Sequence, residues 1–206
     1  VKATADRLMT EKSLGGRSHC FHCKKTLAWY DLLPFVSYLW LKGKCRYCRK
    51  KIPLDVFLTE IVLGVLTAGL FWINISPNLS LVFQLFILVV ISIVFIVDLK
   101  TGLIPDKITY PAEVIAGAYL LFLSVLNPAM IKFFIWAFAS GVGAAALFFL
   151  LIVISHGKGM GFGDVKYVFF LGLALGFPNS LIAIMLAFLT GAIFSLFLIA
   201  FGKKHF

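Results

Sequence analysis

Long apolar runs, broken by short segments rich in Gly, Pro, Asn and charge, occupy the chain from residue 55 to its end. Six of these runs approach the roughly 20 residues that a helix needs to cross the hydrocarbon core of a membrane. None alternates with the period of a strand, and lipid requires backbone polar groups to be bonded internally. We therefore expect six spanning helices, the fifth being short, over residues 55–73, 79–97, 108–126, 130–155, 165–177 and 181–201.

Residues 1–54 differ from the rest in being polar, basic and the location of all four cysteines. We therefore expect a small N-terminal domain over residues 1–54 and a helical membrane domain over residues 55–206. Composition supports this reading, because 61% of the residues are hydrophobic and 14% are charged. A soluble globule could not bury so much apolar surface, and a disordered chain would not contain it. The expected fold class is an all-α polytopic membrane protein.

The net charge of +10 is concentrated at one end of the chain. Residues 1–54 hold 12 Lys and Arg against three acids, whereas residues 55–206 hold seven against six. A basic segment beside a membrane domain is typical of a cytoplasmic segment, so we expect no nucleic-acid partner. Alternate loops and the C-terminal tail are basic, and the other loops are uncharged. The positive-inside bias thus places residues 1–54 and the C-terminus in the cytoplasm; the basic positions are Lys100, Lys107, Lys158, Lys166, Lys203 and Lys204.

The four cysteines form two Cys-x-x-Cys pairs, Cys20 with Cys23 and Cys45 with Cys48. Four thiolates satisfy tetrahedral Zn²⁺, and a two-residue gap lets one tight turn present two sulfurs. Disulfides are the alternative, but they rarely persist in the reducing cytoplasm. A four-cysteine shell needs no contribution from His22 and leaves no open position. The spacing therefore predicts a structural zinc site.

Carboxylates at the ends of the apolar runs require an explanation, because a charge within a span is costly. Asp98 ends the second run and Asp164 opens the fifth, so helix parity places both on the cytoplasmic side. Two carboxylates in a partly dry site can share one proton, as in aspartic proteases. The alternatives are that Asp164 only caps its helix, as Asp often does, and that Asp98 only meets headgroups. Asp106 is a third candidate, although its place after Pro105 is more typical of a helix cap.

Two further features accompany these acids on the same side of the predicted membrane. Glu60 and Glu113 lie one or two turns inside their spans, where they would either support the acids or extend to the headgroups. Residues 157–163 are glycine-rich but lack the Gly-Lys-Ser/Thr ending of a phosphate-binding loop. A flexible hinge that includes Gly161 and Gly163, and lets backbone approach the acids, is the better interpretation.

Three stretches together resemble the bacterial type IV prepilin peptidases, which are GxGD-type intramembrane aspartic proteases. The first runs from Arg17 to Cys48 and includes the cysteines, Asp31, Pro34 and Ser37. The others are Asp98-Leu-Lys-Thr-Gly-Leu-Ile-Pro-Asp106 and Gly161-Phe-Gly-Asp-Val-Lys166. Their order and the intervening spans agree with the family over nearly the whole chain.

The resemblance implies an inner-membrane enzyme that removes the short basic leader of type IV prepilins and type II secretion pseudopilins. Cleavage would follow a glycine on the cytoplasmic side, with Asp98 and Asp164 at the catalytic positions. Many members also methylate the new N-terminus with S-adenosylmethionine, and we identify no methyl-donor motif in this sequence. Relatives have a further spanning helix before the zinc domain. Its absence here leads us to expect a truncated, engineered or incomplete chain.

Two other classes of function use the same features differently. A proton- or cation-coupled transporter would also place acids within its spans, but the sequence lacks a convincing inverted repeat or paired broken helices. A non-catalytic scaffold anchored by zinc would need neither Asp98 nor Asp164 for its activity. Substitution of these two acids separates the peptidase from the scaffold.

Overall fold

A computed structural model describes residues 19–20, 22–32, 36–52, 54–74, 78–157 and 159–201. Residues 1–18, Pro34, Lys158, Lys203 and Lys204, which entered the resemblance or the topology, lie outside the described residues. The contacts divide the chain into two compact units, Val1–Gly102 and Leu103–Phe206. The separation of residues 1–54 as a domain of their own stays a prediction.

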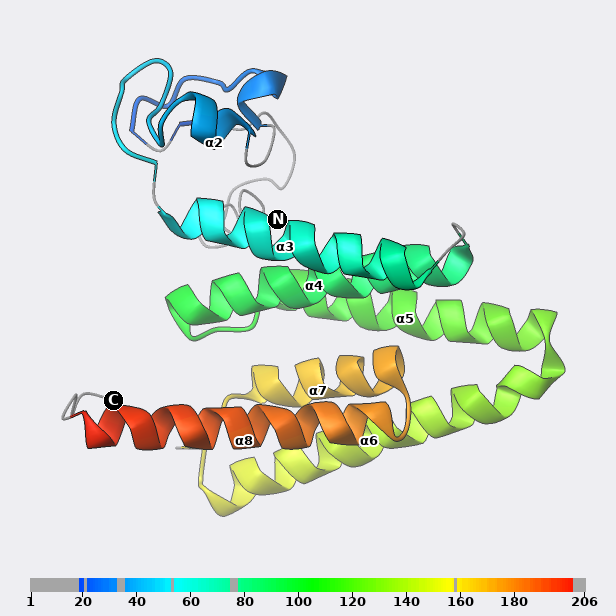
Figure 1. Cartoon of the computed structure of the whole chain (residues 1–206). Coiled ribbons are helices and arrows are strands. Elements are labelled where there is room, and N and C mark those ends of the chain that lie inside the picture. Colours follow the sequence, from blue (N-terminus) through cyan, green and yellow to red (C-terminus); the bar gives the residue numbers. More distant parts are fainter. Residues whose placement is uncertain are drawn as a thin grey trace. The chain divides into compact units, whose positions relative to one another are not determined.

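The described part of the first unit contains a short cysteine-bearing segment and two long helices (Figure 1). Its elements are the 3-10 helix η1 (Trp29–Leu32) and the α-helices α2 (Val36–Trp40), α3 (Leu54–Ile73) and α4 (Leu79–Thr101). Asn78 caps α4, because its side chain accepts a hydrogen bond from the Leu81 N–H at 2.8 Å. Gly102 ends the helix with φ 64°, a conformation that glycine adopts at little cost. α4 therefore extends beyond the apolar run that ends at Val97.

The described part of the second unit contains four helices of 14 to 24 residues, with α7 packed against the other three (Figure 1). Its elements are α5 (Asp106–Leu126), the 3-10 helix η2 (Pro128–Met130), α6 (Ile131–Ile154), α7 (Phe162–Leu175) and α8 (Asn179–Ala200). Glycines allow α6 and α7 to approach closely, since a Cβ on Gly172 would lie 2.2 Å from the Cα of Gly141. Ser140 joins the same crossing, donating from Oγ to the Gly172 carbonyl at 3.3 Å. Close contact through small residues is typical of helices that pack within membranes.

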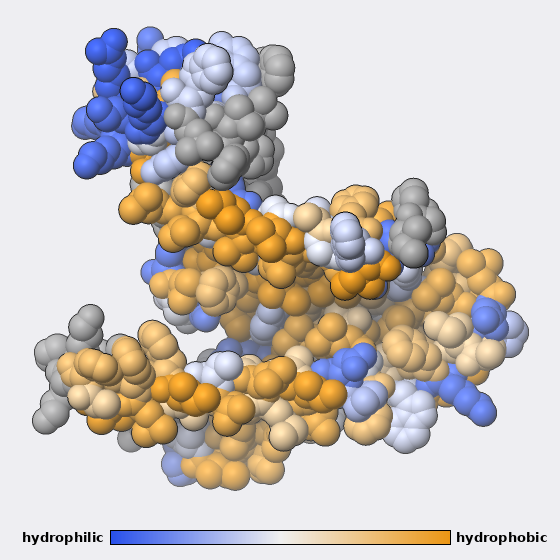
Figure 2. Space-filling view, viewed as in Figure 1, coloured by the Kyte–Doolittle hydropathy of each residue, from blue (hydrophilic) through white to orange (hydrophobic). Residues whose placement is uncertain are grey.

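The long helices expose many large apolar side chains, whereas the cysteine-bearing segment is largely polar (Figure 2). In the described part of the chain, four helical segments are long and apolar enough to span a membrane. These are Leu79–Thr101, Asp106–Leu126, Pro128–Ile154 and Asn179–Phe197. The all-α fold class and a membrane location are thus confirmed. The full count of six crossings stays a prediction, because Phe57–Ile73 is a shorter apolar helix and α7 has only 14 residues.

Candidate functional site

Asp98 lies in the last turn of α4, which ends at Thr101. Its side chain is exposed, and its backbone carbonyl accepts the N–H of Gly102 at 2.7 Å. The sequence predicts that Asp98 ends the second span, and it lies in the last turn of the second long helix. The helix continues to Thr101 because Gly102, rather than the end of the apolar run, terminates it. Asp98 belongs to the first unit and Asp164 to the second, so the meeting of their carboxylates stays a prediction.

Asp164 is the third residue of α7, and its side chain forms a capping box with Gly161, which occupies the cap position. Its Oδ2 accepts a hydrogen bond from the Gly161 N–H at 3.0 Å, and its own N–H donates to the Gly161 carbonyl at 3.1 Å. Asp164 thus contributes to the capping of α7 from within its first turn, while Gly161 occupies the cap position that the sequence alternative gave to Asp164. It remains compatible with acid–base chemistry, because a carboxylate offers two oxygens and about four lone pairs.

Gly161 and Gly163, both predicted to support Asp164, have different surroundings. Gly161 is extended, with φ −86° and ψ 156°, and a Cβ there would lie 3.8 Å from its nearest neighbour, the Asp164 Oδ2. A Cβ on Gly163 would lie 2.9 Å from the Cβ of Ile104, which is closer than real Cβ atoms pack. Gly163 is therefore required by the close approach of residues 103–105 to α7, whereas Gly161 leaves space for a side chain.

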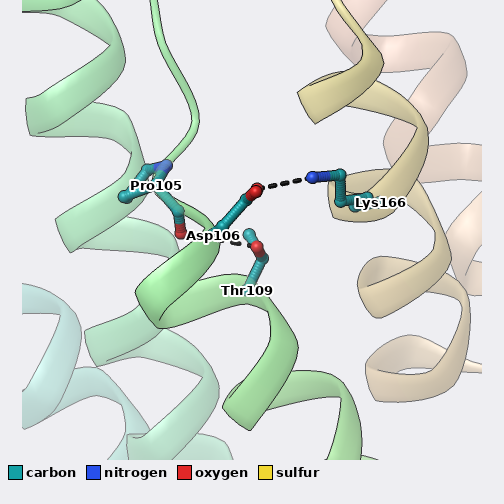
Figure 3. Close-up of polar contacts among 4 residues, drawn as sticks. All are labelled: Pro105, Asp106, Thr109 and Lys166. Atoms are coloured by element: carbon teal, nitrogen blue, oxygen red, sulfur yellow. Dashed lines mark hydrogen bonds and ion pairs between the residues drawn. The ribbon is translucent and has the colours of Figure 1, made fainter.

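Asp106 pairs with Lys166 across the interface of α5 and α7, as Figure 3 shows. The Lys166 Nζ lies 2.6 Å from the Asp106 Oδ1. Asp106 does not cap α5. Pro105 occupies the cap position and Asp106 is the first residue of the helix, so the cap interpretation is wrong. Thr109, fully buried one turn later, donates from Oγ1 to the Pro105 carbonyl at 3.4 Å.

Lys166 is the site residue whose role sequence reasoning missed. Its ammonium lies 4.9 Å from the ring centre of Tyr110 and 5.3 Å from that of Phe162, so two aromatic faces accompany the ion pair. The lysine side chain is 14% exposed, against 56% for Asp106. The available signal was the presence of one acid and one base in two separate motifs, but a separation of 60 residues hides their pairing.

Glu113 lies on α5, two turns beyond Asp106. Its Oε1 is buried, and no described residue offers that atom a hydrogen bond. This oxygen thus lies among protein atoms, and the choice between a supporting role and extension to the headgroups stays open for Glu113. Glu60 on α3 is partly exposed, and its role stays open between the two alternatives.

The sulfur atoms of all four cysteines lie within 4.8 Å of one another. Each Cys-x-x-Cys pair forms the same turn, in which the residue after the second cysteine has a left-handed backbone. Lys24 (φ 54°) donates its N–H to the Cys20 carbonyl at 3.0 Å, and Arg49 (φ 53°) donates to the Cys45 carbonyl at 2.9 Å. The four thiols are free, and their arrangement fits a tetrahedral metal site.

The thiols perturb one another strongly in the metal-free chain. Burial raises the pKa of Cys20, but hydrogen bonds from the backbone of Cys23 and His22 and from nearby thiols outweigh it, giving a pKa of about 7. For Cys48 the backbone of Lys50 lowers the pKa, whereas burial and the other thiols raise it to about 11. Of these two thiols, Cys20 therefore ionises at the lower pH. A cation bound by the sulfurs would favour their ionised forms.

Asp31 and Arg46 connect η1 to the second cysteine turn. The Arg46 Nε lies 2.8 Å from the Asp31 Oδ1, and the Asp31 side chain is 3% exposed. The guanidinium also lies 4.9 Å from the ring centre of Tyr30. Tyr38 of α2 stacks on Phe57 of α3 with ring centres 4.2 Å apart, which joins the cysteine-bearing segment to the first long helix.

Comparison with known proteins assigns both parts of the chain. The bacterial peptidase A24 N-terminal domain matches residues 2–74, and the type IV leader peptidase family matches residues 85–196. The first match contains the four cysteines, and the second contains Asp98, Asp106, Asp164 and Lys166. No solved structure matches the chain.

Three similar proteins are each named prepilin leader peptidase/N-methyltransferase. The protein of Vibrio cholerae is 32% identical over 167 residues, covering 78% of this chain and 62% of its own length. Those of Pectobacterium carotovorum and Aeromonas salmonicida are 29% identical, covering 87% and 92% of this chain. The chain spans slightly less than two thirds of the length of these relatives, 63% and 64% for the latter two.

Proposed function

Because the chain belongs to the type IV leader peptidase family, we propose that it is a membrane aspartic endopeptidase. Its substrates are type IV prepilins or the related pseudopilins of type II secretion, from which it removes the basic leader after a glycine. The observation that carries the proposal is the family match over residues 85–196, which includes both candidate acids. The relatives' shared name supports the same activity.

Asp98 and Asp164 form the catalytic pair in this proposal. One carboxylate removes a proton from a water molecule, whose oxygen attacks the scissile carbonyl carbon. The other carboxyl group gives its proton to the carbonyl oxygen, so the tetrahedral intermediate forms without a net charge at that oxygen. Collapse of the intermediate breaks the C–N bond, and the leaving nitrogen takes up a proton from the pair. The capping contact of Asp164 with Gly161 supports the proposal by orienting that carboxylate within its turn.

The cysteine cluster binds Zn²⁺ as a structural ion in this proposal. Its support is the mutual proximity of four sulfurs presented by two similar turns. Four thiolate ligands fill a tetrahedral shell, so the metal would hold the N-terminal segment together without activating water.

The enzyme operates at the cytoplasmic face of the bacterial inner membrane in this proposal. Its support is the basic character of residues 1–54 together with the exposed apolar surface of the long helices. The apolar helix of the prepilin would lie in the lipid beside the enzyme, and the leader would reach the cytoplasmic acids. Residues 1–54 and the C-terminus share that side.

Methylation of the newly exposed amine is a second activity that the relatives' shared name supports. S-adenosylmethionine would transfer its methyl group from sulfur to the amine nitrogen, which then loses a proton. Both reactions change the mass of the pilin, by loss of the leader and by gain of a methyl group.

Mass spectrometry of a prepilin incubated with the membrane-embedded chain tests the proposed function. We expect a product that begins directly after the leader glycine, and an additional methyl mass when S-adenosylmethionine is supplied. A prepilin that remains intact beside a cleaving relative, in the same membranes, would contradict the proposal. Proton or cation flux in proteoliposomes without cleavage would instead favour the transporter.

A further inference from the structure

The start of α5 and the start of α7 are held together at two adjacent points. A Cβ on Gly163 would lie 2.9 Å from the Cβ of Ile104, so the backbone of α7 closely approaches the segment that leads into α5. Beside it, the Lys166 Nζ lies 2.6 Å from the Asp106 Oδ1 (Figure 3). Asp164, the candidate catalytic residue of this unit, lies between Gly163 and Lys166 in sequence.

Lys166 is more constrained than an ordinary surface lysine. Its side chain is 14% exposed, and its ammonium lies near the faces of Tyr110 and Phe162. One of these rings belongs to α5 and the other to the first residue of α7, so the ammonium contacts both helices. A long flexible side chain is held in one geometry only where several contacts act together.

The positions of Asp164 and Lys166 on α7 give this contact a consequence for the site. Two residues along an α-helix are separated by about 200° around its axis. Contacts that hold Lys166 against α5 therefore turn Asp164 toward the opposite side of α7. Rotation of the first turn would move both side chains together.

We propose that Lys166 is a positioning residue for leader cleavage, which it serves by pairing with Asp106 and fixing the rotation of the first turn of α7. This inference rests on the proposed function. Asp106 is its partner in positioning and has no contact with the reacting atoms in this account. The pair contributes little to stability, because the half-exposed carboxylate of Asp106 is open to solvent screening. Its contribution is expected in the turnover rate.

Steady-state kinetics of prepilin cleavage by the full chain tests the inference. Lys166→Met removes the charge and keeps the length of the side chain. We expect kcat to fall roughly tenfold to a hundredfold, because a small displacement of the catalytic carboxylate slows the reaction by that order. KM should stay near the wild-type value, because the apolar helix of the prepilin provides most of the binding. Lys107→Met, at the exposed lysine beside Asp106, is the matched control and should leave both constants unchanged.

An exchange of the two charges separates positioning from a direct role of the ammonium. Asp106→Asn should lower kcat as Lys166→Met does, and the double variant Asp106→Lys with Lys166→Asp should regain part of the lost rate. Lys166→Arg keeps the charge and should retain most of the wild-type kcat. Thermal unfolding identifies any variant that fails to fold. The kcat values of the remaining variants are then compared with one another.

Two results would overturn the inference. One is a wild-type kcat in Lys166→Met, and the other is an exchange variant no faster than the slower of the single variants. An Asp164→Asn variant in the same series keeps the inference distinct from the proposed function. If Asp164→Asn cleaves normally, the proposed function fails, whereas a loss limited to Asp164→Asn leaves that function intact and rejects only the role of Lys166.

Discussion

The Asp164 carboxylate accepts a hydrogen bond from the backbone N–H of Gly161 at 3.0 Å, so the acid holds the first turn of its own helix. This contact gives Asp164 a structural role beside the proposed catalytic one. A loss of activity on substitution would therefore be ambiguous unless the two roles are separated.

Asp164→Asn and Asp164→Ala separate the two roles. Asn keeps a side-chain oxygen that can accept the Gly161 N–H, whereas Ala leaves this N–H without its acceptor. We expect Ala to cost about 1 kcal/mol of stability and Asn to cost less, while both abolish cleavage. Thermal unfolding of the purified variants measures the difference. Equal destabilisation by Asn and Ala would show that the hydrogen bond is not what Asp164 contributes to the fold.

Gly161 and Gly163 should differ in how strongly substitution by alanine affects stability and cleavage. Gly163→Ala places a Cβ 2.9 Å from Ile104 and forces residues 103–105 away from α7, at a cost of about 1–3 kcal/mol. Gly161→Ala meets no close neighbour and should have a much smaller effect. Cleavage rate and unfolding temperature of the two variants check this expectation. Equal sensitivity at both positions would contradict the packing explanation.

Metal analysis tests the cysteine cluster. We expect one zinc per chain, its loss in Cys45→Ser, and full retention in His22→Ala, which alters an exposed neighbour. Because the Cys48 thiol has a pKa of about 11 without metal, it is protonated at pH 7.5, and zinc binding must release its proton. Zinc affinity should therefore decrease as the pH falls. Zinc loading without proton release would contradict four-thiolate coordination.

The pair of Asp31 and Arg46 should stabilise the cysteine-bearing segment. Arg46→Met leaves the nearly buried Asp31 carboxylate without its cation, and we expect about 1–3 kcal/mol of destabilisation. Arg49→Met removes the same charge from an exposed position in the same turn and is the matched control. Retention of zinc against a competing chelator reports the stability of this segment. Equal zinc loss in both variants would show that net charge, rather than the ion pair, is responsible.

Hydrophobic pattern and cysteine spacing predicted the elements but not their polar contacts. Each of the six expected apolar runs falls largely within one of the helices α3 to α8 of the described chain, because an apolar run in lipid satisfies its backbone polar groups as a helix. The ends of these helices were less predictable from the sequence. α4 continues to Thr101 because Gly102 adopts the left-handed conformation there, and α7 begins at Phe162, ahead of the apolar run.

The contacts of Asp106 illustrate what one sequence cannot provide. The local sequence predicts a cap at Asp106 because this residue follows Pro105, but the proline itself occupies the cap position. The actual partner, Lys166, lies 60 residues away on another helix. Pairing across helices depends on their packing, which here requires the close approach at Gly163 and the crossing at Gly141 and Gly172.

The initial rate of leader removal by Asp98→Asn and by Asp164→Asn tests most directly the claim that these two acids share the chemistry. Both variants, embedded in the same membranes and given the same prepilin, should be slower than the wild-type chain by about three orders of magnitude or more. Asp106→Asn should lose much less of the wild-type cleavage rate. Wild-type cleavage by either Asp98→Asn or Asp164→Asn would contradict the account.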